Sequence, residues 1–113
     1  MSKKERTKGA AFEREVAKLL HPFWPSARRN IEQYQSSDGR DLSDTQPICF
    51  QLKRRKMTKL WEIKHAYFEA DESTDEDYPY PAAVWRDDNG DAMVMMKVEH
   101  LVEMLCKIED RGL

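Results

Sequence analysis

The chain has 113 residues and a mass of 13.4 kDa, which is the size of one small domain. Hydrophobic residues make up 40% and charged residues 35% of it, so the composition allows a modest core and excludes a chain that is disordered throughout. Its longest apolar runs are a few residues, far short of the roughly 20 that cross a bilayer. Its charged N-terminus lacks the apolar segment of a secretory signal. We therefore expect a single cytoplasmic domain.

The charge is distributed unevenly along the chain. The formal net charge is -2, which by itself argues against a nucleic-acid-binding protein. Residues 1–64, however, contain 15 lysines and arginines against 8 acidic residues, whereas residues 65–113 contain 4 against 13. The two parts therefore carry +7 and -9. This asymmetry predicts a basic working face within the first half of the domain.

Periodicity and turn residues predict an α/β fold. Apolar residues at helical spacing predict helices, alternation predicts strands, and an Asn-Gly pair predicts a hairpin turn between the last two strands. The expected elements are a helix over residues 7–21 ended by prolines, a short strand over 27–31, a polar loop over 33–45, a strand over 48–53, a helix over 58–70, an acidic loop over 69–77, strands over 82–86 and 92–96, and a helix over 98–108. This order predicts a small central mixed β-sheet flanked by helices.

Some elements also carry a prediction about packing. The strand over 48–53 is expected to bury one apolar face and to carry Gln51 and Lys53 together on the other. Both cysteines are expected in or near the core, and the three tryptophans in the core or an interface rather than on a base-stacking surface, although Trp61 flanks a basic run. The final helix is expected to direct three apolar side chains inward, namely Leu101, Leu105 and Ile108.

A possible chemical site centres on Asp41, which precedes Gln51 by ten residues and Lys53 by twelve. A hairpin-like return from the loop into the strand would bring these side chains to one end of the sheet. Carboxylate and amide oxygens suit a hard cation such as Mg²⁺, and a metal beside a lysine suits phosphodiester hydrolysis. Glu13 and Glu15 lie at opposite borders of the first helix's apolar stripe, and periodicity does not choose between them. The structural alternative for Asp41 is a loop carboxylate that accepts backbone N–H bonds.

Three short motifs follow one another in the first half of the chain: Lys8-Gly9-x-x-x-Glu13-Arg14-Glu15, Gly39-Arg40-Asp41-Leu42 and Gln51-x-Lys53. In this order they resemble the motifs of PD-(D/E)XK nucleases of the archaeal and phage Holliday-junction-resolvase type. The resemblance implies a restriction-endonuclease-like fold, Mg²⁺ or Mn²⁺ as cofactor, and cleavage of DNA, commonly by a homodimer. It also implies that Glu13 is the glutamate of the first helix, Asp41 the metal-binding aspartate and Lys53 the motif lysine.

Gln51 departs from the family pattern, because it occupies the position of the second acidic ligand. An amide keeps a carbonyl oxygen but removes a negative charge, so metal affinity should fall while the coordination position is kept. Two functions therefore stay open. One is a metal-dependent endodeoxyribonuclease that cleaves branched DNA such as a Holliday junction, and the other is a non-catalytic DNA-binding or regulatory protein on a nuclease scaffold. A protein-interaction module that uses the acidic segment 69–77 is a third alternative.

Basic side chains surround the suspected site and suit contact with DNA phosphates. A charge run is often only a solvated face, but the concentration of these cations around the site favours binding. The resemblance adds a second copy of the chain as a partner, and, for a phage protein, the host cytoplasm as its location. The residues predicted to contact DNA are Lys8, Arg28, Arg29, Arg40, Arg54, Arg55 and Lys56.

Overall fold

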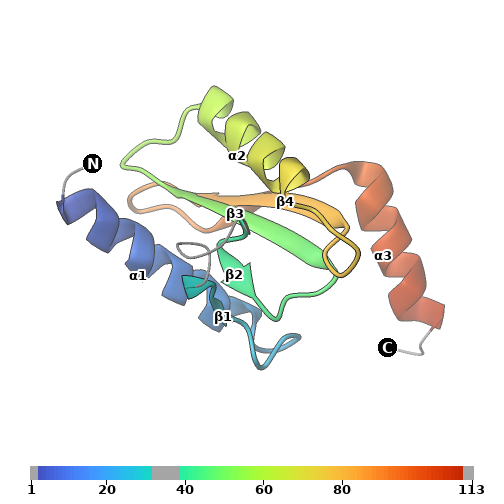
Figure 1. The fold of residues 1–113 in the computed structure, drawn as a ribbon. Coiled ribbons are helices and arrows are strands. Elements are labelled where there is room, and N and C mark those ends of the chain that lie inside the picture. The colour runs from blue at the N-terminus through green and yellow to red at the C-terminus, as the bar shows by residue number, and fades with distance from the viewer. Residues whose placement is uncertain (1–2, 32–38, 111–113) are drawn as a thin grey trace.

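The structure is a computed structural model that describes residues 3–31 and 39–110, and it has an α/β architecture (Figure 1). The elements are α1 (Lys3–Leu20), β1 (Arg28–Arg29), β2 (Leu42–Ser43), β3 (Ile48–Arg54), α2 (Leu60–Glu72), β4 (Tyr80–Arg86), β5 (Met93–Met95) and α3 (Val98–Asp110). The predicted order is confirmed, with β2 added inside the predicted polar loop. Residues 32–38, which fall in that loop, lie outside the described residues. Within the described ranges, no helix is long and apolar enough to span a membrane.

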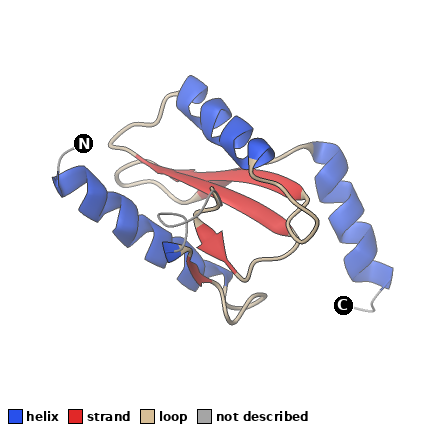
Figure 2. Ribbon diagram, viewed as in Figure 1, coloured by secondary structure: helices blue, strands red, loops and turns tan. Residues whose placement is uncertain are grey.

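The central sheet is mixed and has the strand order β3-β4-β5 (Figure 2). β3 and β4 run parallel from the pair Ile48 and Tyr80 to the pair Arg54 and Arg86, and α2 is the crossover between them. β4 and β5 form an antiparallel hairpin. Its turn contains Asn89 at a φ of 63°, the left-handed conformation that an Asn-Gly turn accommodates. The predicted hairpin and mixed sheet are therefore confirmed, while β1 and β2 form a separate antiparallel pair.

The helices α1 and α2 cover opposite faces of the sheet (Figures 1 and 2). On the α1 side, Phe12 packs in the main core with Phe50 and Val84. On the α2 side, Ile63 and Ala83 belong to a smaller buried cluster. Burial of these apolar side chains is the main stabilising contribution to a domain of this size. The site described below lies at the edge of this three-layered arrangement.

Cover on both sides buries both faces of β3. Cys49 is fully buried and its thiol donates to the carbonyl oxygen of Ala70 on α2, while Gln51 is 8% exposed. The prediction of one apolar and one polar face is therefore wrong, because a parallel strand between two helical layers has no solvent face. The buried position of Cys49 matches the prediction, whereas Cys106 is exposed, which corrects that half of it.

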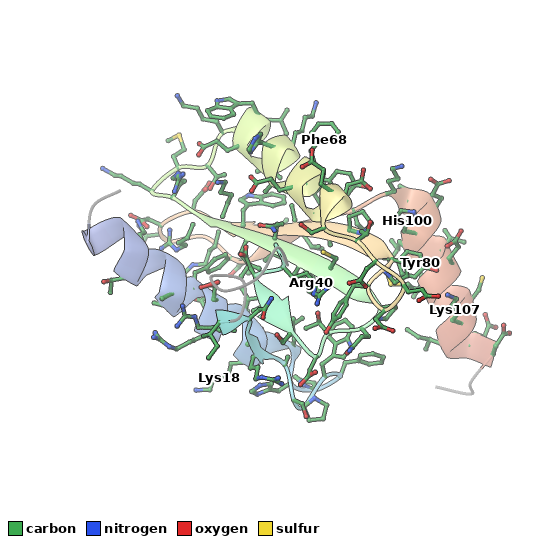
Figure 3. The ribbon with its side chains drawn as sticks, viewed as in Figure 1. Lys18, Arg40, Phe68, Tyr80, His100 and Lys107 are labelled. Atoms are coloured by element: carbon green, nitrogen blue, oxygen red, sulfur yellow. The ribbon has the colours of Figure 1, made fainter. Side chains whose placement is uncertain are left out.

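α3 lies beside one end of the sheet (Figure 1) and buries none of its residues. Leu101, Leu105 and Ile108 line an apolar pocket against residues 23–24 and 46–48, so they face the body of the domain as predicted. They do not join the buried core, because Leu101 stays 44% exposed and Leu105 55% exposed. A polar cluster also joins α3 to the sheet (Figure 3). The Tyr80 hydroxyl donates to Glu103 at 2.9 Å and accepts from Lys107 Nζ at 2.9 Å, and the Tyr80 ring centroid lies 5.1 Å from that of His100. α3 is thus attached through the polar groups at the start of β4 and through Met104, which is half-buried against the main core.

Candidate functional site

Asp41 is held against the edge of β3 that faces away from β4. Its backbone N–H donates to the Phe50 carbonyl oxygen at 3.1 Å, and its own carbonyl oxygen accepts from the N–H of Asn30 at 3.0 Å. Its side-chain Oδ2 accepts from the N–H of Leu52 at 2.7 Å. The loop therefore returns beside β3 in the way that the spacing predicts. The Leu52 bond also gives the carboxylate the backbone partner of the structural alternative.

Gln51 anchors the segment that carries Asp41. It alternates with Phe50 and Leu52 along β3, so it leaves the strand on the face covered by α2. Its Nε2 donates to the carbonyl oxygen of Gly39. Gly39 has no room for a side chain, because a Cβ atom there would lie 2.5 Å from the Oγ of Ser73, the residue that ends α2. The segment that leads from Gly39 to Asp41 therefore lies against both β3 and the end of α2.

The pKa of Asp41 is shifted by its burial and by the charged groups around it. Burial raises the pKa of Asp41 to about 7, and the hydrogen bond from the N–H of Leu52 opposes this rise. The carboxylates of Glu13 and Glu69 raise the pKa of Asp41 further, whereas Lys53 lowers it. Two acids and one lysine, from α1, α2 and β3, therefore lie near enough to Asp41 to affect its pKa.

Glu13, rather than Glu15, is the glutamate of α1 that faces this edge. Glu13 is 7% exposed and accepts a hydrogen bond from Arg29 Nε at 3.2 Å. Glu15 instead accepts from Arg86 at the end of β4. The structure therefore places Glu13, and not Glu15, near Asp41, a choice that periodicity leaves open. The ion pair with Arg29 also links α1 to the segment that leads into the site loop.

Glu69 is the member of this group that the sequence analysis missed. Its position was predicted at the border of the acidic loop, but α2 continues to Glu72. Glu69 directly precedes the buried Ala70, so it lies on the flank of α2 next to β3. Its Oε1 lies 2.8 Å from His65 Nδ1, one turn earlier. The position of Glu69 relative to the buried stripe of the helix is the signal that could have identified it.

The oxygen atoms at this edge suit a hard divalent cation. In the described part of the chain, no three His, Cys, Asp or Glu side chains are close enough together to hold a metal ion. Mg²⁺, however, usually keeps several waters and takes only one or two carboxylates from a protein. Asp41 offers a carboxylate, Gln51 an amide oxygen and Glu13 a second carboxylate nearby. This donor set fits Mg²⁺ or Mn²⁺ and contains none of the sulfur ligands that select softer metals.

Six of the seven cations predicted to contact DNA form ion pairs within the chain. Three of these pairs use acids from beyond residue 64, so the basic and acidic halves of the sequence meet in the fold. Residues 1–64 therefore present less unpaired positive charge to solvent than their net charge of +7 predicts. The pairs are Lys8 and Arg54 with Asp88 at 3.2 and 2.8 Å, Arg28 with Asp44, Arg29 with Glu13 at 3.2 Å, Arg40 with Asp75 at 2.8 Å, and Arg55 with Glu62 at 2.9 Å.

Lysines without such a pair gather where β3 leads into α2. Lys56, the seventh predicted cation, is exposed and forms no ion pair with any residue that the structure describes. Within the described ranges, the exposed Lys59 and Lys64 and the half-buried Lys53 also form no ion pair. Lys53 lies close enough to Asp41 to affect its pKa, so this group of lysines begins at the candidate site and continues onto the start of α2.

Comparison of the chain with protein-family models, with curated proteins and with solved structures found no match.

Proposed function

We propose that this chain is a metal-dependent endodeoxyribonuclease that hydrolyses phosphodiester bonds in branched DNA, such as a Holliday junction. One observation carries the proposal: Glu13 and Lys53, from two distant segments, both act on the ionisation of Asp41, which is bonded to β3 directly beside Gln51. An acid, an amide and a lysine at one sheet edge suit phosphodiester chemistry. The order of the three motifs supports the same activity.

Each residue has a distinct role in this proposal. Asp41 and the amide oxygen of Gln51 would hold Mg²⁺ or Mn²⁺, with Glu13 as a further carboxylate. When bound, the metal polarises a phosphoryl oxygen and makes water a stronger nucleophile. Lys53 orients the attacking water and offsets the negative charge of the acids. Glu69 supplies a carboxylate from the α2 side, where Gln51 lacks one.

The raised pKa of Asp41 supports a site that prefers a positive ligand. Burial and two neighbouring acids make the ionised form of this carboxyl costly. A divalent cation would remove that cost, because it stabilises the ionised form of all three acids. Metal binding should therefore release protons near neutral pH.

Cleavage of defined DNA substrates tests the proposal. The purified protein is incubated with four-way junction, duplex and single-stranded DNA, with Mg²⁺, Mn²⁺ or EDTA. We expect metal-dependent cleavage that is strongest on the junction and lost in Asp41→Ala. Asp91→Ala, a change at an exposed turn residue, is the matched control and should retain activity. Absence of cleavage on every substrate, or full activity of Asp41→Ala, would overturn the catalytic role.

A non-catalytic DNA-binding protein on the same scaffold is the second candidate. The specific observation in its favour is that both proposed metal ligands already make structural hydrogen bonds, Asp41 to Leu52 and Gln51 to Gly39. This candidate predicts salt-sensitive DNA binding without turnover. Gln51→Glu separates the two: a gain in metal affinity and cleavage favours the nuclease, whereas a variant that binds DNA but neither binds metal nor cleaves favours the scaffold.

A homodimer in the cytoplasm completes the proposal. Large apolar residues on α3 are exposed, with Val98 at 75% and Leu105 at 55%. Next to them lies an apolar pocket of about 430 Å³ between α3 and residues 23–24 and 46–48. A second copy could cover this surface, since exposed apolar patches commonly mark interfaces. Light scattering should give twice the monomer mass, and Val98→Glu with Leu105→Glu should give the monomer mass; a monomeric wild-type protein would remove this part of the proposal.

A further inference from the structure

The outer face of α2 carries two exposed aromatic side chains among lysines. Trp61 is 66% exposed and Phe68 is 61% exposed. They are seven residues apart, which places them on one stripe of the helix, and Lys64 lies between them. Figure 3 shows Phe68 on the side of α2 away from the sheet. Tryptophan was expected in the core or an interface, and the exposure of Trp61 excludes the core and leaves a contact with a partner.

The surroundings of Trp61 are basic. Lys56, Lys59 and Lys64 are all exposed, and none of the three forms an ion pair with a described residue. The amino-terminal end of α2 adds the partial positive charge of its unpaired backbone N–H groups. At the other end of the stripe, Glu72 follows Phe68 by one turn. An anionic ligand is therefore favoured at the Trp61 end of the helix.

We propose that this face of α2, together with the segment that leads into it, binds an unpaired stretch of nucleic acid. Its residues are Lys56, Lys59, Trp61, Lys64 and Phe68, here called the α2 patch. Trp61 stacks on a base while the lysines contact phosphates. Single-stranded nucleic acid is bound elsewhere by this combination of aromatic platforms and a basic track, because every base has a π-face and every linkage a charge. A duplex buries its base faces in its own stack, so an exposed indole on a basic surface matches unpaired nucleotides better.

The position of the α2 patch suits it to hold DNA that also contacts the candidate site. Lys53 acts on Asp41, and the chain runs from Lys53 through Lys56 to the start of α2. A strand that is bound at the site and extends along the end of β3 would therefore reach the patch. This step depends on the proposed function: the patch would select DNA that has unpaired nucleotides next to the cleaved bond, as at a branch point or a gap.

Binding to short oligonucleotides in EDTA tests the α2 patch separately from catalysis. The probes are a 12-nucleotide oligothymidine and a 12-base-pair hairpin duplex, and the readouts are fluorescence anisotropy of the labelled DNA and quenching of tryptophan emission. We expect Trp61→Ala to weaken oligothymidine binding by roughly 5- to 150-fold, the range for loss of one stacked base, and to change duplex binding less than twofold. Trp61→Phe should restore most of the affinity, and Phe68→Ala should have a smaller effect.

The possible outcomes separate this inference from the nuclease proposal. If Trp61→Ala binds oligothymidine as tightly as the wild-type protein, the stacking role is overturned, even when the protein cleaves junctions. If the wild-type protein loses affinity on Trp61→Ala but never cleaves DNA, the α2 patch stands and the nuclease proposal fails. If Trp61→Ala instead changes the mass measured by light scattering and leaves oligothymidine binding intact, the patch is a protein contact and the inference is overturned.

Discussion

The cations of this domain occupy two regions with different surroundings. Around the site loop and its neighbours, arginines pair with acids, as Arg40 does with Asp75 and Arg29 with Glu13. Where β3 leads into α2, Lys56 and Lys59 are exposed and form no ion pair with a described residue. The net charge of a sequence segment therefore says little about where a phosphate would bind. Pairing within the fold decides which cations remain available to a ligand.

Lys53 belongs to the unpaired group but faces the site, so its removal gives the largest expected effect. Lys53→Ala should reduce junction cleavage by about 100-fold or more, the lower range for loss of a group that positions or protonates reactants. DNA affinity should change less than threefold. Single-turnover cleavage and anisotropy measure the two quantities, and Lys56→Ala is the matched control from the same region. Equal loss of rate in both variants would show that Lys53 acts only as one more phosphate contact.

The pH dependence of the free energy of unfolding tests the buried state of Asp41. Its folded-state pKa of about 7 exceeds the ordinary value near 3.9, so the unfolded chain releases this proton first as pH rises. The contribution of Asp41 to stability should therefore fall between pH 4 and pH 7 and then level off. Acids with a lowered pKa, such as Glu62 and Asp75, contribute in the opposite direction in both proteins. Asp41→Asn lacks this fall and still accepts the Leu52 hydrogen bond. Because Asp41 keeps partial exposure, we expect the variant to be more stable by about 2 kcal/mol at pH 8.

Urea unfolding in EDTA at pH 4 and pH 8 measures this difference. At pH 4 the two proteins should agree within about 0.5 kcal/mol. Asp91→Asn, at the exposed hairpin turn, is the matched control and should show no difference that depends on pH. The same stability difference for Asp41→Asn at both pH values would contradict the buried, raised-pKa state of Asp41.

The unpaired lysines should dominate the salt dependence of binding to single strands. Combined replacement of Lys56, Lys59 and Lys64 by alanine should weaken oligothymidine binding by about 10-fold at moderate salt. It should also make the slope of log K against log salt shallower by about 2, since each phosphate contact contributes about 0.7. Arg28→Ala, which removes a cation paired with Asp44, is the control and should alter the slope by less than about 0.5. Equal slopes for both variants would remove the distinction between the two regions.

Arg40 should matter more for stability than for binding. Its guanidinium pairs with Asp75 at 2.8 Å and lies 3.7 Å from the centroid of the Tyr78 ring. Arg40→Ala should lower the free energy of unfolding by about 1 kcal/mol, because a partly exposed ion pair and a cation–π contact each contribute little. Urea unfolding measures the loss, with Arg14→Ala on the exposed side of α1 as control. A large loss of DNA affinity without loss of stability would contradict this prediction and show that Arg40 contacts DNA.

Local patterns in the sequence were sufficient to predict much of the fold. Alternation over β3 and the Asn89-Gly90 turn predicted the strand and the hairpin that the structure contains. The short separation between Asp41 and β3 predicted that the loop would return beside the strand, and the backbone bond from Asp41 to Phe50 shows that it does. These features depend on residues close together in the chain, which is why periodicity and spacing could anticipate them.

Features that depend on distant partners could not be predicted in this way. The pair between Arg40 and Asp75 joins residues 35 positions apart, and nothing in either local pattern indicates the other. Glu69 was not predicted as a site residue because the acidic run over residues 69–77 suggested a loop, whereas α2 continues to Glu72. The apolar stripe of α3 predicted an inward face, and that face lines a pocket, but periodicity does not state how closely the rest of the domain covers it.

The polar attachment of α3 has a consequence for how the domain opens. α3 fully buries no residue and is held through Tyr80, Glu103, Lys107 and the half-buried Met104, so its detachment would remove little of the packing between α1, α2 and the sheet. Its backbone amides should then exchange with solvent through local opening, much faster than those of β3 and β4. If a second copy covers this helix, that exchange will slow as protein concentration rises, while exchange in the sheet stays the same. The amides of α3 would thus report assembly, and those of the sheet would report folding.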